Sequence, residues 1–219
     1  MGEKRVVPGP LKRLLNVDAA VTNVFCRITE NYMSPTKFRN HFKALEISCH
    51  SLPWIATWVA LFWVLWNPDL FEMQVNFFIG LIIDILCVAI MKALVRRRRP
   101  PGNKPDMFLT VGSDIYSFPS GHVSRAVFIS LFFSQLYPLG NILSFLLYTW
   151  AILVAISRVL LKRHYLLDVT GGAVLGFIEA GIVSIIWLNK RSSVSIINWL
   201  SEEKITLEGL QDAVEIDID

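Results

Sequence analysis

The sequence predicts an all-α integral membrane protein, and three observations lead to this fold class. Hydrophobic residues occupy 53% of the 219 positions, which is a high share for a soluble domain. Five apolar stretches have about the length that a helix needs to enter a bilayer. Turns marked by proline, glycine or clustered charge separate these stretches. We therefore expect one helical bundle of about five spans, preceded by an interfacial helix.

Residues 1–46 are expected to form a basic arm followed by an amphipathic helix. Apolar residues recur at helical spacing over 11–26, which gives this helix one apolar face. Asp18 and Asn23 interrupt the run and make it too polar for an ordinary span. We expect the helix to lie in the membrane interface. An amphipathic helix packed on the core is an equal alternative.

The membrane-embedded core is expected over 47–190. Asn67-Pro68-Asp69 ends the first apolar helix, and a basic loop rich in proline ends the second at Val95. Pro138-Leu139-Gly140 separates the third helix from the fourth. The expected spans are 47–66, 73–95, 122–137, 141–161 and 167–188.

The last span and the tail have distinct compositions. Gly172, Gly176 and Ala180 recur one turn apart, which favours close contact between this span and another helix. Residues 191–219 are polar and end acidic, as in a surface helix or a disordered end.

Charge and cysteine content limit the classes of partner. The net charge of +3 is small and gives no indication of nucleic-acid binding. The three cysteines, which are few, odd in number and scattered, predict neither a disulfide framework nor a metal cluster. The expected partners are the phospholipid bilayer and a lipid substrate, with no cofactor. The sequence leaves the oligomeric state open.

Three polar stretches, 92–100, 116–122 and 157–169, interrupt the apolar chain. The second expected span ends at the first stretch, and the third span begins at the second. The third and fourth spans then run out and back, each about 25 Å long at 1.5 Å per residue. All three stretches are therefore expected on one side of the membrane.

The residue types in these stretches suit phosphate binding. Arginine offers a planar fork that matches phosphate oxygens, and lysine offers a compact positive charge. Ser120 is a favourable N-cap, and Gly121 lets a ligand approach the backbone. A helix that begins there presents free N–H groups to an anion. The cations expected in this phosphate cradle are Lys92, Arg99 and Arg158.

Two histidines supply reactive groups. His164 and Asp168 are four residues apart and share a face of a helix. A carboxylate beside an imidazole fixes its tautomer, which makes His164 a candidate nucleophile toward phosphorus. His122 is a candidate general acid for the leaving oxygen. No carboxylate cluster for Mg²⁺ accompanies these residues, so we expect no metal.

These residues resemble the three sequence blocks of the type 2 phosphatidic acid phosphatase (PAP2) superfamily. The blocks match in order and without gaps: Lys92-x6-Arg99-Pro100, Pro119-Ser120-Gly121-His122 and Ser157-Arg158-x5-His164-x3-Asp168. The resemblance implies a bundle of the PAP2/haloperoxidase-like type. It also implies a phosphohistidine at His164 oriented by Asp168, His122 as general acid, and no metal. The phosphate-binding residues that it implies are Lys92, Arg99, Ser120, Gly121 and Arg158.

A narrower likeness runs from about residue 11 to about residue 188. The segments "LVRRRRP", "DMF" at 106–108 and "YSFPSGH" are similar to the presqualene and polyisoprenoid diphosphate phosphatase branch. That branch implies farnesyl, geranylgeranyl and presqualene diphosphates as substrates, at the endoplasmic reticulum and nuclear envelope. Three alternatives stay open: a phosphatase of phosphatidate, lysophosphatidate or sphingoid phosphate, a non-catalytic membrane scaffold, and a vanadate-dependent peroxidase.

Several other polar residues receive structural interpretations. The run 96–98 is expected to anchor the helix at the membrane surface. Asp84 and Glu179 are expected as buried structural groups, and His50 as a structural polar residue. Arg125 is expected either to contact substrate or to pair with Asp84. The basic loop favours a cytosolic active site, but its cations also serve the substrate, so sidedness stays open.

Overall fold

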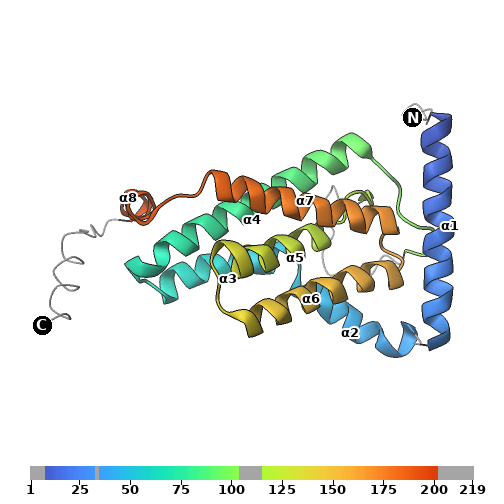
Figure 1. Ribbon diagram of the computed structural model, residues 1–219, viewed down its shortest axis with the longest axis horizontal. Helices are drawn as coiled ribbons and strands as arrows, with labels where there is room; N and C mark the ends of the chain where they lie inside the picture. The colour runs from blue at the N-terminus through green and yellow to red at the C-terminus, as the bar shows by residue number, and fades with distance from the viewer. Residues whose placement is uncertain (1–7, 33–34, 104–114, 202–219) are drawn as a thin grey trace, which may run out of the picture.

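The computed structural model describes residues 8–32, 35–103 and 115–201, which are almost entirely helical (Figure 1). The expected arm before residue 8, the segment 106–108 and most of the expected tail lie outside these residues. The elements in chain order are α1 (Gly9–Tyr32), α2 (Pro35–Ser48), α3 (Ser51–Val64), α4 (Pro68–Val95), α5 (Gly121–Leu131), the π-helix η2 (Phe132–Leu136), α6 (Asn141–Leu160), α7 (Leu166–Ile185) and α8 (Lys190–Leu200).

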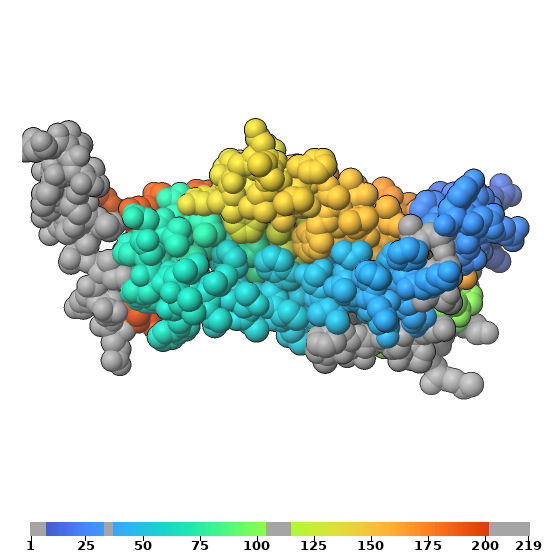
Figure 2. Space-filling model, turned by 90° about the horizontal axis from the view of Figure 1, so that it is seen from below, coloured from blue at the N-terminus to red at the C-terminus, as the bar shows by residue number. Residues whose placement is uncertain are grey.

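The helices α3 to α7 run lengthwise in the molecule, while α1 and α8 lie across its opposite ends (Figure 1). The space-filling view shows the same elongated form, with α1 at one end (Figure 2). The short helix α5 is central, since it contacts α4, α6 and α7. Most of its side chains are buried. The helix that carries the Pro-Ser-Gly-His block therefore lies inside the bundle.

The predicted membrane bundle is confirmed, but with fewer spans than expected. Among the described residues, α4, α6 and α7 are long and apolar enough to cross a membrane. A fourth span results if the segments Lys37–Ser48 and Ser51–Val64, which meet at a bend of 50°, count as one. The expected third span, 122–137, is instead the short buried α5 followed by a π-helical turn. An apolar sequence does not distinguish a helix buried in protein from one that faces lipid.

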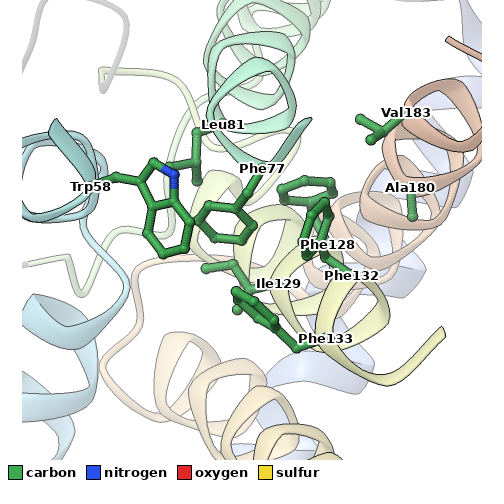
Figure 3. Close-up of a cluster of buried hydrophobic side chains, with 9 residues drawn as sticks. All are labelled: Trp58, Phe77, Leu81, Phe128, Ile129, Phe132, Phe133, Ala180 and Val183. Carbon is green, nitrogen blue, oxygen red and sulfur yellow. The ribbon is translucent and has the colours of Figure 1, made fainter. Parts of the chain in front are cut away.

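An aromatic cluster joins the bundle at the end away from the Lys92 turn of α4 (Figure 3). The Phe77 ring lies 4.2 Å from that of Trp58 on α3 and 4.9 Å from those of Phe132 and Phe133. Aromatic pairs at such separations contribute about 1 kcal/mol each beyond burial. Phe77 and Lys92 lie on one helix about 22 Å apart. The packing of Phe77 thus fixes the position of α4, the helix that carries Lys92 at its other end.

The predicted small-residue contact lies between α7 and α5. A Cβ atom at Gly172 would lie 2.5 Å from the carbonyl oxygen of Ser120, and one at Gly176 would collide with that of Ser124. The first turn of α5 therefore touches the second and third turns of α7. The Ser120 N–H also donates to the Asp168 carbonyl at 3.0 Å. These contacts place the start of α5 against the start of α7.

The ionisable residues inside the bundle are paired. Arg125 on α5 donates to Asp84 on α4 in a short ion pair, and it also donates to the Cys49 carbonyl at 3.0 Å. Ser124 donates to Glu179 on α7 at 2.9 Å. Arg125 therefore takes the second of its two predicted roles. These pairs join α4, α5 and α7 inside the bundle.

Candidate active site

The three polar stretches meet at the end of the bundle that α1 crosses. Lys92 lies in the last turn of α4, which ends at Arg96 in a left-handed conformation with φ of 52°. The chain then runs back beside the segment before α5, where the Ser117 N–H donates to the Arg97 carbonyl at 2.8 Å. The loop from α6 to α7 carries His164 to the same place. The predicted convergence of the three blocks at one end is what the structure has.

Ser117 orients the imidazole of His164. The Nδ1 atom lies 2.8 Å from the Ser117 carbonyl oxygen, which can only accept a hydrogen bond. Nδ1 therefore carries the proton, and the lone pair lies on Nε2. Burial in the site lowers the pKa of His164 well below its ordinary value, and the cations of Arg99, Arg158 and Lys92 lower it further. The ring is thus neutral at neutral pH, as a nucleophile must be.

Asp168 is farther from His164 than the resemblance implies. Its Oδ2 atom lies 3.9 Å from Nδ1 of His164, which is within ion-pair range and beyond hydrogen-bond range. The carboxylate instead accepts the Tyr165 N–H at 2.8 Å and the Arg97 guanidinium at 2.7 Å. Asp168 consequently fixes the first turn of α7 and the loop before it, while a backbone carbonyl holds the ring.

The candidate phosphate ligands are buried, except for Arg99, which is half-buried. Lys92 is 4% exposed and Arg158 is fully buried. Nη2 of Arg158 donates to Glu46 at 3.1 Å. Its Nη1 and the Ser120 hydroxyl have no hydrogen-bond partner within the described part of the chain. Leaving a buried donor unpaired costs about 1–3 kcal/mol, so an anion that accepts from these groups would bind favourably.

His122 belongs to the same site. It stands in the first turn of α5, and its Nε2 atom is buried with no partner among the residues that the structure describes. Burial lowers the pKa of His122 well below its ordinary value, and the cation of Arg158 lowers it further. The ring of His50, at the start of α3, lies 6.0 Å from that of His122. The cation of Arg158 thus lies close to both of the predicted reactive histidines.

Four charged residues of this site were not predicted to take part in it: Asp18, Glu46, Arg97 and Arg163. Glu46 on α2 accepts from Arg158 and, at 3.5 Å, from the buried Arg163. Arg97 was expected as a surface anchor, but its side chain is only 9% exposed and contacts Asp168 and Asp18. The exposed Arg96 and Arg98 fit the anchor interpretation better.

The sequence offers a partial signal for only one of these four. Asp18 interrupts an otherwise apolar helical face, which marks it as unusual for that position. Glu46, Arg97 and Arg163 have no local pattern that separates them from solvated charges. Among the described residues, no group of three or more His, Cys, Asp and Glu side chains is arranged to hold a metal ion.

Comparison with known proteins identifies the family and a relative of known description. The sequence profile of the PAP2 superfamily matches residues 73–192. The chain is 37% identical over 195 residues to "Probable lipid phosphate phosphatase beta" of Arabidopsis thaliana. That match covers 76% of this chain and 87% of the relative.

Two solved structures share the fold. The first is LpxE of Aquifex aeolicus, with a TM-score of 0.53 and 21% identity, over 73% of this chain and 92% of that one. The second is the first transmembrane PAP2 type phosphatidylglycerolphosphate phosphatase from Bacillus subtilis. Its TM-score is 0.55 at 24% identity, over 80% of this chain and 86% of that one. At these identities the likeness shows the arrangement of helices in the membrane.

Proposed function

We propose a mechanism and a substrate class for this chain, which belongs to the PAP2 superfamily and is a lipid phosphate phosphatase embedded in the membrane. The observation that carries the mechanism is the bond from Nδ1 of His164 to the Ser117 carbonyl. It leaves the Nε2 lone pair of a neutral imidazole among the cations that would hold a phosphoryl group.

The proposed reaction has two steps and uses no metal. In the first, Nε2 of His164 attacks phosphorus, and the bond from phosphorus to the leaving oxygen breaks. His122, which the negative charge of a bound head group would favour in its protonated form, gives its proton to that oxygen. In the second, His122 accepts a proton from water as the water oxygen attacks phosphorus. The bond from phosphorus to Nε2 of His164 breaks, and inorganic phosphate is released. Lys92, Arg99, Arg158, Ser120 and Gly121 stabilise the charge on the phosphoryl oxygens.

The proposed substrates are isoprenoid diphosphates and monophosphates, with the tail in the bilayer and the head group in the site. The segments "LVRRRRP" and "YSFPSGH", which are similar to the polyisoprenoid diphosphate phosphatase branch, favour this class. Cations near His164 also outnumber carboxylates. Arg163, which is 1% exposed, adds a guanidinium beyond the three motif cations. A diphosphate carries more negative charge than a monoester and benefits more from this excess.

A phosphate of a glycerolipid is the second candidate. The structurally similar Bacillus subtilis protein is described as a phosphatidylglycerolphosphate phosphatase, which makes that lipid a specific alternative. Phosphatidate, lysophosphatidate and sphingoid phosphate belong to the same group of rivals. A non-catalytic scaffold is disfavoured because the reactive groups are complete.

Phosphate release from a panel of lipids tests the substrate class. The purified full chain in detergent, with EDTA present, should release phosphate faster from farnesyl, geranylgeranyl or presqualene diphosphate than from the glycerolipid phosphates or sphingoid phosphate. Faster turnover of phosphatidate or phosphatidylglycerol phosphate would overturn the substrate class. The variant His164→Ala should lose turnover, and His41→Ala, which changes an exposed histidine of α2, should keep it.

We also propose that the protein resides in the endoplasmic reticulum and nuclear envelope. Within that membrane, we propose that α1 lies in the interface beside the active site. Leu14, Val17, Val21, Val24 and Ile28 recur every three or four residues, and each is at least 50% exposed. Such a stripe at the end of a membrane bundle suits contact with lipid. Protease protection in sealed microsomes, with tags at either end of the chain, would assign the side of the membrane on which the site opens.

A further inference from the structure

Helix α1 forms hydrogen bonds to the first residues of α7, which directly follow the loop that carries His164. It crosses the end of the bundle at which α7 begins (Figure 1). Asp18 accepts the Leu167 N–H at 3.0 Å, and Thr22 accepts the Leu166 N–H at 3.1 Å. The first N–H groups of a helix lack partners within that helix. A different helix, far away in the sequence, therefore caps α7 directly after His164.

Asp18 also reaches the active site through Arg97. One guanidinium nitrogen of Arg97 lies 2.5 Å from Asp18, and the other lies 2.7 Å from Asp168. The side chains of Arg97 and Asp18 are 9% and 8% exposed, and that of Asp168 is fully buried. The guanidinium is stacked 4.1 Å above the ring of Tyr165. A bidentate, stacked arginine of this kind has one well-defined position.

The two carboxylates hold Arg97 on opposite sides. Asp168 needs a cation because a buried carboxylate without a partner is strongly disfavoured. Arg97 needs a second anchor because the site beside it is built to collect an anion, which would attract the guanidinium. Asp18 supplies this anchor from outside the phosphate cradle. Removing its charge would free Arg97 to shift away from Asp168.

We propose that Asp18 is a positioning residue for phosphoryl transfer, which acts through Arg97 on Asp168 and the loop that carries His164. This inference rests on the proposed role of His164 as nucleophile. The Asp18 carboxylate contacts the Arg97 guanidinium and the Leu167 N–H, and neither of these groups is a proposed phosphate ligand. Loss of the Asp18 charge should therefore lower kcat and leave KM almost unchanged.

The variant Asp18→Asn tests the charge separately from the helix cap. Asparagine keeps an acceptor for the Leu167 N–H and a similar volume, but it cannot form the ion pair. We expect kcat to fall about tenfold or more, by analogy with the loss of a residue that orients a metal-binding histidine. KM should change less than about twofold. Asp18→Glu, which retains the charge, should recover part of the loss.

A matched control lies on the same helix. Glu30 contacts Lys162 of the same loop at 3.6 Å, but both side chains are more than 40% exposed. Glu30→Gln should leave kcat and KM unchanged. A comparable fall in kcat for Glu30→Gln would overturn the proposal, since the effect would then follow any charge change on α1.

A double-mutant cycle tests the route through Arg97. Arg97→Lys keeps the charge but cannot reach both carboxylates with a fork, so it should lower kcat as Asp18→Asn does. Adding Asp18→Asn to Arg97→Lys should cost little more, because both changes break one connection. Fully additive losses, a raised KM with normal kcat, or normal activity of Asp18→Asn would overturn the proposal.

If Asp18→Asn does not fold, the variants Arg97→Lys and Asp18→Glu test the proposal instead. Arg97→Lys should then lower kcat and leave KM almost unchanged, and Asp18→Glu should lower kcat less. Turnover by His164→Ala would overturn the proposed function and this inference together, whereas an inactive His164→Ala with a normal Asp18→Asn would overturn this inference alone.

Discussion

Nδ1 of His164 lies 2.8 Å from the carbonyl oxygen of Ser117, so the candidate nucleophile is oriented by the loop that leads into α5. The same loop carries Ser120, and His122 follows it in the first turn of α5. The bond therefore joins the polar stretches 116–122 and 157–169 through a main-chain atom. Since a backbone carbonyl has no titratable state, the tautomer of His164 stays fixed over the whole pH range in which the fold is stable.

The first prediction concerns the acid side of the pH profile. Burial and the cations of Arg99, Arg158 and Lys92 hold the pKa of His164 well below its ordinary value. The neutral ring is the reactive form, so activity is present above this lowered pKa and is lost as the pH falls through it. The acid limb of kcat/KM should therefore lie below the ordinary histidine pKa of about 6.5.

The variant Arg99→Gln makes this prediction sharper. Removing one nearby cation should raise the pKa of His164 and move the acid limb to higher pH, in addition to weakening substrate binding. Lys190→Gln, which changes an exposed cation of α8, should not move it. An acid limb in Arg99→Gln that coincides with that of the unmodified chain would contradict the electrostatic explanation.

The second prediction concerns Ser120, whose buried hydroxyl has no partner among the described residues. Ser120→Ala should weaken inhibition by inorganic phosphate about tenfold, since a hydrogen bond to a charged group contributes about 1.5–3 kcal/mol. The melting temperature in detergent should stay the same or rise. Ser130→Ala, which removes a buried hydroxyl that donates to the Leu147 carbonyl, should lower stability without changing phosphate inhibition.

The third prediction concerns the contact between α5 and α7. Gly172→Ala places a methyl group against the Ser120 carbonyl, and overpacking of this kind costs about 1–3 kcal/mol. Both stability and activity should fall, because Ser120 moves with the backbone. Gly181→Ala is the matched control, since nothing lies within 4 Å of the position of its Cβ. Equal melting temperatures for the two variants would show that the backbones do not touch.

The fourth prediction concerns the buried pair of Arg125 and Asp84. Asp84→Asn should destabilise the chain by about 3–5 kcal/mol, because it leaves a buried guanidinium without its counter-ion. The double variant Asp84→Leu, Arg125→Met should recover much of this loss. Asp69→Asn, which breaks an exposed ion pair with Lys190, should cost at most about 1 kcal/mol. Thermal unfolding in one detergent compares the three.

The placement of the motif residues at one end of the bundle was predictable from the lengths and order of the apolar helices between them. The order of helices placed Lys92, Ser120 and His164 at one end, as the structure has them. The number of spans was not predictable, since 122–137 is as apolar as a true span and is buried by its neighbours. The position of Gly172 was predictable, because close helix contact in a membrane requires small residues.

The supporting charges could not be found from the sequence. Glu46 and Asp18 reach Arg158 and Arg97 across more than 70 positions of the chain, and such pairs leave no local periodicity. Arg97 stands between Arg96 and Arg98 with nothing in the sequence to distinguish it. Only the fold of the loop turns this one side chain inward. The Ser117 carbonyl is equally hidden, because a main-chain acceptor has no signature in side-chain chemistry.

The central claim is that His164 receives the phosphoryl group, and trapping the phosphoenzyme tests it most directly. Rapid acid quench of the full chain with a substrate radiolabelled in its terminal phosphate, followed by peptide mapping, should place the label on His164. Label and turnover should both be absent from His164→Ala. Label on another residue, or turnover by His164→Ala, would contradict the claim.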